Sequence, residues 1–164
     1  AHDCMIGNKC IIANNVQIGG HVVVEDYVNF GGQSGVHHFV TIGKHSMVGG
    51  LTRVTQDVPP FMVFVGARTH ARVRMVNGVG LQRCGFSNQE IANLKAAYMK
   101  LFSRRARLSG RSLLDNVELL REECGDDPNV DYLCHFLTRA FAHGRNGRYL
   151  ESLRRSSGGS KGSA

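Results

Sequence analysis

The feature that most constrains this chain is a six-residue period that runs without interruption from Ile6 to Pro59. Each unit opens with Ile, Val or Phe, and its fifth residue is small or of medium size. A period of this kind is typical of a solenoid, in which every repeat stacks on its neighbours. The opening residues of the nine units are Ile6, Ile12, Ile18, Val24, Phe30, Val36, Ile42, Val48 and Val54.

Three units make one triangular coil, so residues separated by one full coil in the sequence stack about 4.8 Å from each other. The pattern predicts short parallel strands over residues 4–60, with all nine opening residues buried in a one-dimensional core. The expected fold class is mainly β plus α: a left-handed parallel β-helix of hexapeptide repeats, followed by a small C-terminal helical domain.

The repeat ends at Pro59 and Pro60, because proline cannot donate to a sheet ladder. Residues 61–66 are expected to form one last strand, and the composition then changes from Gly and Val to Leu, Arg and Ala. We divide the chain into a β-helix (1–66), a basic connecting segment (67–86), a helical C-terminal domain (87–155) and a flexible tail (156–164).

Three helices are predicted in the C-terminal domain, packed as a small bundle or across subunits. Ser87 and Glu90 form a capping box, which predicts that the first helix begins after Ser87. The second should start at Ser112, and residues 125–128 (Gly-Asp-Asp-Pro) separate it from the third. The apolar stripes are Ile91, Leu94, Tyr98, Leu101 and Phe102; Leu113, Leu114, Val117, Leu119 and Leu120; and Val130, Leu133, Cys134, Phe136, Leu137 and Phe141.

The chain carries a net charge of +7 with His neutral, and its arginines are concentrated after residue 66. A positive surface attracts acidic partners such as phosphates, nucleic acids, anionic lipids or acidic proteins. No apolar run approaches the roughly 20 residues that span a bilayer, and no signal peptide is recognisable. The arginines of the connecting segment and the first helices include Arg68, Arg72, Arg74, Arg104, Arg105, Arg107 and Arg111.

Five cysteines without CxxC spacing argue against a disulfide framework or a structural zinc site and favour a reducing compartment. The repeat is already in phase at Cys4, and a solenoid of three coils would leave an open strand edge. We therefore expect the chain to be the C-terminal piece of a longer solenoid.

Histidines gather on one side of the predicted coil. Because His2, Gly20 and His38 are each one full coil apart, they stack in one column, and the next column begins with Asp3 and continues with His21. The resulting patch is about 10 Å tall, or two strand spacings. It consists of His2, Asp3, Gly20, His21, His37 and His38.

This patch has the parts of a general base site. An imidazole such as that of His2 deprotonates a hydroxyl near neutral pH. Asp3 is suited to orienting an imidazole, although neighbours on a strand point to opposite sides, so pairing with His2 requires a bend in the backbone. Gly20 has no side chain and leaves its N–H open to an incoming carbonyl, as an oxyanion donor requires.

The patch has two other interpretations. One is a metal site, but His2 and His38 are expected about 10 Å apart, whereas zinc–nitrogen bonds are about 2.1 Å. An ion would then have to bridge subunits, and no metal is expected. The other is a group of surface histidines without function. Outside the patch, His45 and His70 belong to no cluster, and His135 and His143 are expected on a helix surface.

The sequence resembles the acyl-ACP:UDP-N-acetylglucosamine O-acyltransferase family, which carries out the first step of lipid A synthesis. The resemblance covers residues 1 to about 105 well and the remaining helices loosely. Its most specific parts are the histidine-bearing segments and residues 76–86. The matching segments are Ala-His-Asp-Cys (1–4), Ala-Asn-Asn (13–15), Gly-Gly-His-Val (19–22), Val-His-His-Phe (36–39), Met-Val-Gly-Gly (47–50), Gln-Asp-Val-Pro-Pro (56–60) and Val-Asn-Gly-Val-Gly-Leu-Gln-Arg-Cys-Gly-Phe (76–86).

The resemblance implies a catalytic role for three residues. His2 matches the family's general base, which takes the proton from the sugar 3-hydroxyl. Asp3 matches the acid that supports this base. The backbone N–H of Gly20 matches the oxyanion donor.

The resemblance also implies substrate contacts. His21 and His37 match histidines that contact the sugar nucleotide or shape the site, and His38 stands beside them where the family commonly has Gln. Asn77 and Arg83 match residues that hold the uridine diphosphate from a neighbouring subunit.

Gly50 matches the family's acyl-chain ruler, at which Gly leaves room for a long chain. The sequence departs from the family at Val79, where an acid is usual, and at Cys84, where a second Arg is usual. These departures bear on nucleotide affinity and specificity.

Together these features predict an acyltransferase that moves a 3-hydroxyacyl group from acyl carrier protein to the 3-position of UDP-N-acetylglucosamine. The resemblance implies a homotrimer in the bacterial cytoplasm and direct attack without a covalent intermediate, with arginines docking the acidic carrier protein. No cofactor, nucleic-acid partner or membrane span is expected. Two alternatives stay open: another hexapeptide acyltransferase, such as the later N-acyltransferase of the same pathway, and a non-catalytic trimeric scaffold or fragment.

Overall fold

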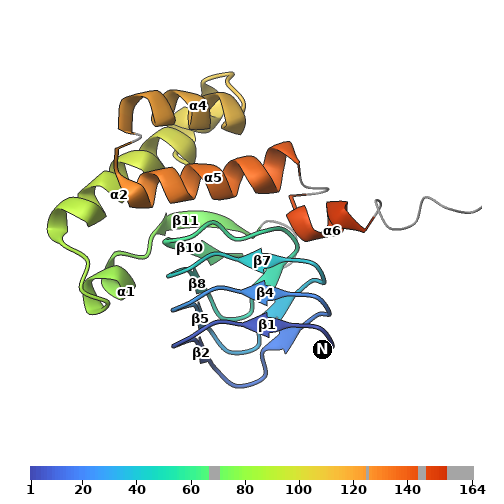
Figure 1. Cartoon of the computed structure of the whole chain (residues 1–164). Coiled ribbons are helices and arrows are strands. Elements are labelled where there is room, and N and C mark those ends of the chain that lie inside the picture. The colour runs from blue at the N-terminus through green and yellow to red at the C-terminus, as the bar shows by residue number, and fades with distance from the viewer. Residues whose placement is uncertain (67–70, 125, 144–146, 155–164) are drawn as a thin grey trace, which may run out of the picture.

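The computed structural model describes residues 1–66, 71–124, 126–143 and 147–154, and its first part is a parallel β-helix of three coils (Figure 1). Strands that are one coil apart pair in register, as in β1–β4–β7 and β3–β6–β9. Each strand of the coils is two residues long. They are β1 (Met5–Ile6), β2 (Ile11–Ile12), β3 (Gln17–Ile18), β4 (Val23–Val24), β5 (Asn29–Phe30), β6 (Gly35–Val36), β7 (Thr41–Ile42), β8 (Met47–Val48) and β9 (Arg53–Val54).

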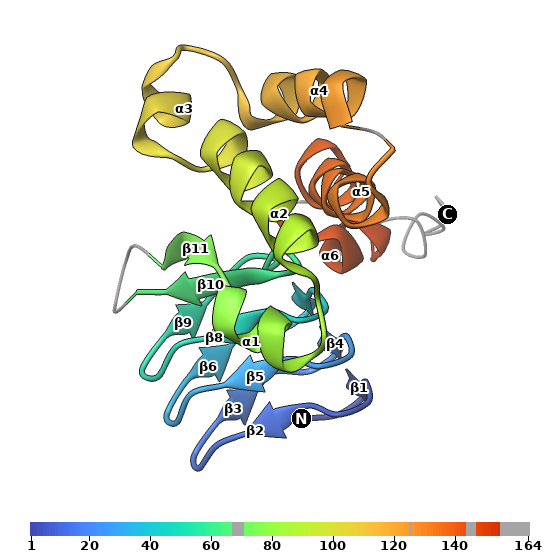
Figure 2. The same ribbon diagram turned by 90° about the vertical axis from the view of Figure 1, so that its left-hand side faces the viewer.

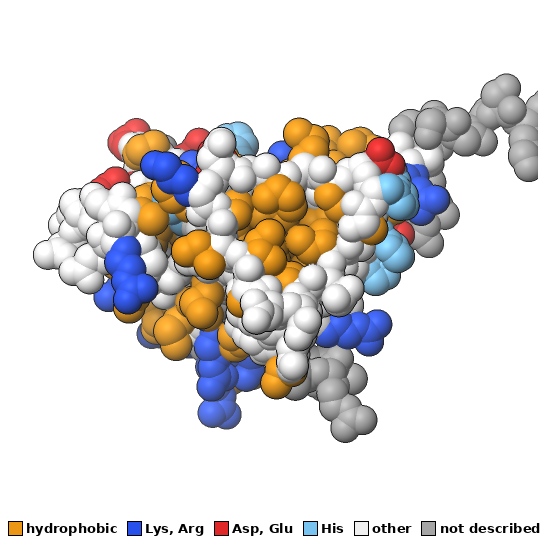
Figure 3. Space-filling view, turned by 90° about the horizontal axis from the view of Figure 1, so that it is seen from below, with side chains coloured by type: hydrophobic (Ala, Val, Ile, Leu, Met, Phe, Trp, Pro, Cys, Tyr) orange, Lys and Arg blue, Asp and Glu red, His pale blue; other side chains and the backbone are white. Residues whose placement is uncertain are grey.

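The opening residues point into the coil as predicted, but not all of them are buried. Those of the second and third coils, from Val24 to Val54, are at most 6% exposed. Ile6 is 47% exposed and Ile12 is 43% exposed, and Ile18 is only half-buried. The prediction that all nine are buried is therefore wrong for the first coil, because within this chain no coil packs beneath it. Figure 3, viewed from below, shows apolar side chains gathered on this face.

The coil turns at left-handed residues that recur every six positions. An L-residue with positive φ reverses the direction of the chain sharply, but it costs roughly 1–2 kcal/mol. Glycine occupies none of these positions. The residues are Asp3, Lys9, Asn15, His21, Tyr27, Gln33, Phe39, His45 and Leu51, with φ between 53° and 63°.

A second sheet element closes the top of the β-helix. The predicted last strand is β10 (Met62–Val65), which pairs in parallel with β8 and antiparallel with β11 (Arg72–Val76). Phe61, Met62 and Phe64 are fully buried there, under the helices that follow. The segment predicted as a basic connection thus contains a strand and also a helix, α1 (Gly78–Arg83).

The helical domain lies above the closed end of the β-helix (Figures 1 and 2). All three predicted helices are present, and the capping box of Ser87 and Glu90 is formed. Leu119 is an exception within the predicted stripes, because it is 38% exposed. The helices are α2 (Asn88–Leu101), α3 (Arg104–Leu108), α4 (Leu113–Cys124), α5 (Pro128–Ala142) and α6 (Tyr149–Leu153), of which α3 and α6 were not predicted.

Two carboxylates tie the helices to the β-helix. Glu25 accepts hydrogen bonds from the hydroxyl of Tyr132 on α5 and from the backbone N–H of Lys44, both at 2.8 Å. Asp57 is buried and accepts from the backbone N–H groups of Thr41 at 2.7 Å and of Tyr149, at the start of α6, at 3.1 Å. The helical domain is therefore anchored at two separate places.

No described helix is both long and apolar enough to cross a membrane. The predicted flexible tail (156–164) lies outside the described residues, as do Arg68, His70 and Gly125.

Candidate active site

One corner of the β-helix carries the predicted catalytic residues. His2 and Asp3 precede β1, while Gly20 and His21 precede β4 at the same corner, one coil further on. The backbone holds this register, since the N–H of His21 donates to the carbonyl of His2 at 3.0 Å. The repeat of the coil thus brings the residues together as the sequence predicted.

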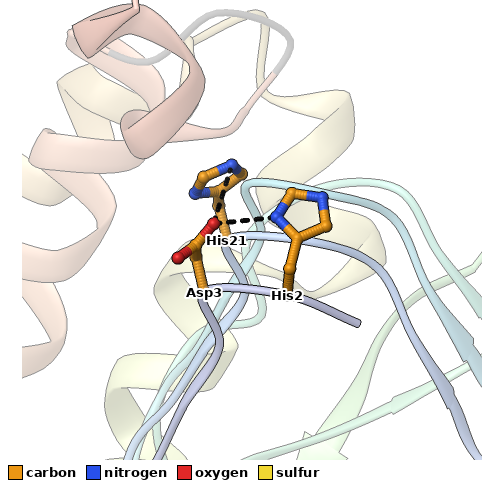
Figure 4. A group of neighbouring side chains, drawn as sticks. All are labelled: His2, Asp3 and His21. Atoms are coloured by element: carbon orange, nitrogen blue, oxygen red, sulfur yellow. Dashed lines mark hydrogen bonds and ion pairs between the residues drawn. The ribbon is translucent and has the colours of Figure 1, made fainter.

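His2 and Asp3 form a hydrogen-bonded pair, with Nδ1 of His2 2.8 Å from Oδ2 of Asp3 (Figure 4). Adjacent residues on a flat strand cannot face each other, but Asp3 has φ of 56°. This left-handed corner is the backbone bend that the pairing requires.

The surroundings of Asp3 favour its ionised form. The hydrogen bond from His2 is the main cause that lowers the pKa of Asp3, and the charge of the nearby His21 adds to it. Asp3 is therefore a carboxylate at neutral pH and accepts the proton of Nδ1. The lone pair of the neutral imidazole is then on Nε2 of His2, where a general base needs it.

Gly20 lies directly under the His2 ring. A Cβ atom added to Gly20 would stand 2.8 Å from Nε2 of His2, closer than side chains approach one another. No described hydrogen bond uses the N–H of Gly20. This position therefore requires glycine for space, and it places a free backbone donor close to the basic nitrogen.

The second column of the corner is a stack of rings. His21 lies edge-on to His2 with ring centroids 4.9 Å apart, and it stacks on Phe39 at 4.6 Å with an interplanar angle of 10°. The guanidinium of Arg154, just after α6, lies 4.8 Å from the centre of the Phe39 ring. No role was assigned from the sequence to Phe39 or Arg154. Because Phe39 follows His21 by one full coil, the spacing does predict that Phe39 lies next to His21.

His37 and His38 border a shallow hollow of about 350 Å³ beside this corner. Their rings are 4.2 Å apart, and Nδ1 of His37 lies 3.1 Å from the carbonyl of His38. The floor of the hollow is the outer face of β3, β6 and β9, where Gly35 opens space and Arg53 contributes a positive charge. A ligand held there would lie next to the His2 pair.

Three of the predicted site residues lie away from this corner within the chain. The side chain of Asn77 is buried, donates to the carbonyl of His45 at 2.9 Å and caps α1 by accepting from the N–H of Gly80. Arg83 is exposed at the end of α1. Gly50 is exposed at a third corner. One chain alone does not bring these residues to His2.

His45 was expected to belong to no cluster, and the structure shows otherwise. Its ring stacks on Tyr27 at 4.6 Å and lies edge-on to Phe86 at 5.0 Å. Burial lowers its pKa. His45 is therefore part of an aromatic cluster at the corner next to Asn77.

The metal interpretation needs a correction, because it considered only His2 and His38. The donor atoms of His2, Asp3 and His21 all lie within 4.8 Å of one another in a single chain. These three residues could coordinate one ion without any help from a second subunit.

Comparison with known proteins gave consistent matches. The family model described as UDP-N-acetylglucosamine O-acyltransferase, domain 2, matches residues 57–146. The solved structure of an Arabidopsis UDP-N-acetylglucosamine acyltransferase is 39% identical, with a TM-score of 0.81 over 88% of this chain and 50% of that one. The Campylobacter jejuni acyltransferase is 36% identical, with a TM-score of 0.74 over 84% of this chain and 50% of that one.

A third structure, the acyltransferase of Francisella novicida, is 28% identical, with a TM-score of 0.75 over 84% of this chain and 48% of that one. The chain thus spans about half the length of the structures it matches. These likenesses confirm the predicted left-handed β-helix with a C-terminal helical domain.

Proposed function

Because the chain belongs to the UDP-N-acetylglucosamine O-acyltransferase family, we propose that it supplies the C-terminal half of an enzyme of lipid A synthesis. This enzyme transfers a 3-hydroxyacyl group from acyl carrier protein to the 3-hydroxyl of UDP-N-acetylglucosamine. The observation that carries the proposal is the His2–Asp3 pair, 2.8 Å apart, with the free nitrogen of His2 next to Gly20.

The proposed reaction is a direct acyl transfer. The sugar 3-hydroxyl attacks the thioester carbonyl while Nε2 of His2 takes the hydroxyl proton. Asp3 stabilises the imidazolium that forms, because its carboxylate accepts from Nδ1. As the tetrahedral intermediate collapses, the imidazolium returns the proton to the departing thiolate of the carrier protein.

Gly20 supplies the oxyanion donor in this scheme. Its backbone N–H is held rigidly, since the neighbouring His21 N–H and the Gly20 carbonyl are both bonded to adjacent coils. One preorganised donor of this kind is typically worth about 10²–10³ in rate. Cys4 is not the nucleophile here, because its thiol is half-buried and faces the carbonyl of Gly19 at 3.0 Å.

A homotrimer completes the proposed site. Arg83 is exposed and lies away from His2 within one chain, so we propose that it binds the uridine diphosphate at the site of a neighbouring subunit. Asn77 is buried and hydrogen-bonded within its own chain, so its part in that contact is to cap α1, which carries Arg83. His21, His37 and His38 line the sugar side next to the hollow of about 350 Å³.

Gly50 sets the length of the acyl chain that the proposed site accepts, because the absence of a side chain leaves room for a long chain. A side chain there is blocked only by the carbonyl oxygen of Gly32, 3.3 Å from the position of a Cβ. The left-handed residue of this corner is Leu51 and not Gly50, so the corner does not need glycine at position 50 for its backbone conformation.

The acidic carrier protein is proposed to dock on the arginines of β11 and α3. These side chains are exposed. Arg72, Arg107 and Arg111 border a hollow of about 370 Å³ whose floor contains Leu101 and Phe102. Such a surface attracts an acidic partner over a distance and then offers apolar contact.

The proposed location is the bacterial cytoplasm, where acyl carrier protein and nucleotide sugars are available. One of the matched structures is from a plant, so the family is not confined to bacteria.

The test is an acyl-transfer assay on the protein as encoded, with 3-hydroxyacyl carrier protein and UDP-N-acetylglucosamine, and with the product identified by mass spectrometry. His2→Ala should lower kcat about 10²–10⁴-fold, while substrate binding and trimerisation stay near normal. His135→Ala, a histidine on α5 that also has an aspartate partner, is the matched control and should be fully active. A loss of less than about tenfold for His2→Ala would place the base at His37 or His38.

The same assay separates the alternatives. Turnover with acyl-CoA but not with the carrier protein, or with an amino sugar acceptor, indicates a different hexapeptide acyltransferase. Binding of UDP-N-acetylglucosamine without turnover from any donor indicates a non-catalytic scaffold.

A further inference from the structure

Two imidazoles and one carboxylate meet at the surface of the first corner. Oδ2 of Asp3 lies 2.8 Å from Nδ1 of His2 and 3.8 Å from Nε2 of His21 (Figure 4). The side chains of His2, Asp3 and His21 are 72%, 66% and 42% exposed, so a solute can reach all three. Within the described part of the chain, this is the one such group with three donors in reach of a single ion.

We propose that His2, Asp3 and His21 form a binding site for a divalent transition-metal ion, with zinc as the best match. Two histidine nitrogens and one carboxylate oxygen, with a water in the fourth position, make a donor set that zinc accepts. The nitrogen ligands disfavour magnesium and calcium, which prefer oxygen throughout.

The donor distances fit a tetrahedral ion after rotation of the side chains. Ligands bound at 2.0–2.1 Å in a tetrahedron lie about 3.3 Å from each other. The Asp3 oxygen lies 2.8 Å and 3.8 Å from the two nitrogens, on either side of this value, and all three donor atoms lie within 4.8 Å of one another, so binding requires the two imidazoles to turn toward a common point. Because the side chains are exposed, such rotations meet little resistance from packing.

Histidines are the ion-pair partners of Asp3 among the described residues. The guanidinium of Arg154 lies over the Phe39 ring, on the far side of the His21 stack from Asp3. A metal ion can therefore replace the proton between His2 and Asp3 without first breaking a salt bridge of Asp3 to a permanent cation. The two histidines must be neutral to bind, so the ion competes with protons for these nitrogens.

Metal binding has a consequence for the base, which rests on the proposed function. An ion held at Nδ1 of His2 leaves the imidazole proton on Nε2. This is the opposite tautomer from the one that Asp3 otherwise maintains. His2 then has no lone pair to accept the proton of the sugar hydroxyl, so the bound ion inhibits acyl transfer.

The site is tested by metal binding to the full chain with no tag present. Zinc affinity is measured by competition with a chromophoric chelator, and Co²⁺ is added separately to report its ligands by absorption. We expect one ion per chain, cobalt bands typical of nitrogen and oxygen ligands, and a loss of affinity of at least about tenfold in His2→Ala, Asp3→Asn and His21→Ala.

His135→Ala is the matched control, because His135 lies 3.5 Å from Asp131 but has Arg121 beside it in place of a second histidine. It should bind zinc like the unmodified chain.

Three results would overturn the site: unchanged affinity in His21→Ala, a thiolate-to-cobalt band, or one ion per three chains. The first would indicate that His2 and Asp3 hold the ion without His21. The second would indicate cysteine ligands, and the third a site shared between subunits.

The binding measurement needs no turnover, so it can fail independently of the proposed function. If the zinc site is absent but His2→Ala still abolishes acyl transfer by metal-free protein, the proposed function stands without the site. If zinc binds as expected but leaves acyl transfer unchanged, the site stands and the role of His2 as the base is wrong.

Discussion

The core of the β-helix is exposed at its first coil and closed at its third, so the contribution of burial to stability can be tested at two equivalent positions of one sheet. Ile6 and Ile42 are opening residues of the same column, separated only by Val24, with which both strands pair in register. Ile42 is fully buried, whereas Ile6 is 47% exposed. The same substitution at both positions therefore compares burial alone, with residue type, strand and register held constant.

The expected magnitudes follow from this difference. Ile→Ala removes carbons worth about 0.8 kcal/mol each when buried, and a closed site adds a cavity term, so Ile42→Ala should cost about 2–5 kcal/mol. Because Ile6 is only about half-buried, Ile6→Ala loses about half of the free energy gained by removing these carbons from water. It also leaves no closed cavity, so a loss of stability of about 1 kcal/mol is expected. Ile42→Asp should prevent folding, because an unpaired buried charge has no partner there.

The assay is urea unfolding followed by circular dichroism, at equal protomer concentration for all variants because assembly contributes to stability. The midpoint of Ile42→Ala should fall well below that of Ile6→Ala, with similar slopes. Equal losses at the two positions would refute the reasoning, since they would mean that something covers Ile6 in solution as completely as Ile42 is covered.

Three further predictions concern other parts of the molecule. Burial raises the pKa of Asp57 from 3.8 to about 6, so its stabilising contribution is complete below about pH 4 and is lost as the pH rises through 6, by about 3 kcal/mol at most. In Asp57→Asn this part of the pH dependence of the urea midpoint should disappear, and an unchanged slope between pH 4 and 7 would contradict it. Gly20→Ala should displace the His2 ring and lower kcat as much as His2→Ala does, with no additional loss in the double variant; additive losses would show that the two residues act separately. Gly50→Met should shift activity toward shorter acyl chains at about 0.8 kcal/mol for each methylene excluded, and an equal loss of rate on long and short chains would show that Gly50 is not a ruler.

The repeat predicted the β-helix because a six-residue period has few other physical solutions. It could not reveal the exposure of Ile6 and Ile12, since the pattern is identical in every coil and burial depends on what lies beneath. It also gave no sign of the left-handed corners. Residues such as Asp3, Asn15 and His21 are of types enriched at positive φ, but Tyr27 and Leu51 at equivalent corners are not, so residue type does not mark the series.

The column of His2, Gly20 and His38 was predictable from spacing alone, but the bond between His2 and Asp3 was not. That contact depends on the backbone conformation of Asp3, which no side-chain pattern encodes. For the same reason, His21 was overlooked as a metal ligand, although its side chain reaches Asp3 from the next coil.

The secondary structure outside the repeat was predicted unevenly. The start of α2, the first of the predicted helices, was placed correctly because Ser87 and Glu90 form a complete capping box. Strand β11 and helix α1 were missed, although the alternation of Arg72–Val76 and the capping residue Asn77 were visible in the sequence. The short helix α6 has no such signal, and the N–H of Tyr149 is held by Asp57, which is 92 residues away in the sequence.

The left-handed corners separate the residues available for chemistry from the residues that stabilise the fold. Inward positions carry the core, while the left-handed corners carry His21, Tyr27 or Leu51 with equal geometry. A reactive group moved by one full coil keeps its orientation and advances about 4.8 Å along the axis. Substitutions at equivalent corner positions can therefore move a functional group along the axis by whole coils, without any change in the inward-facing residues.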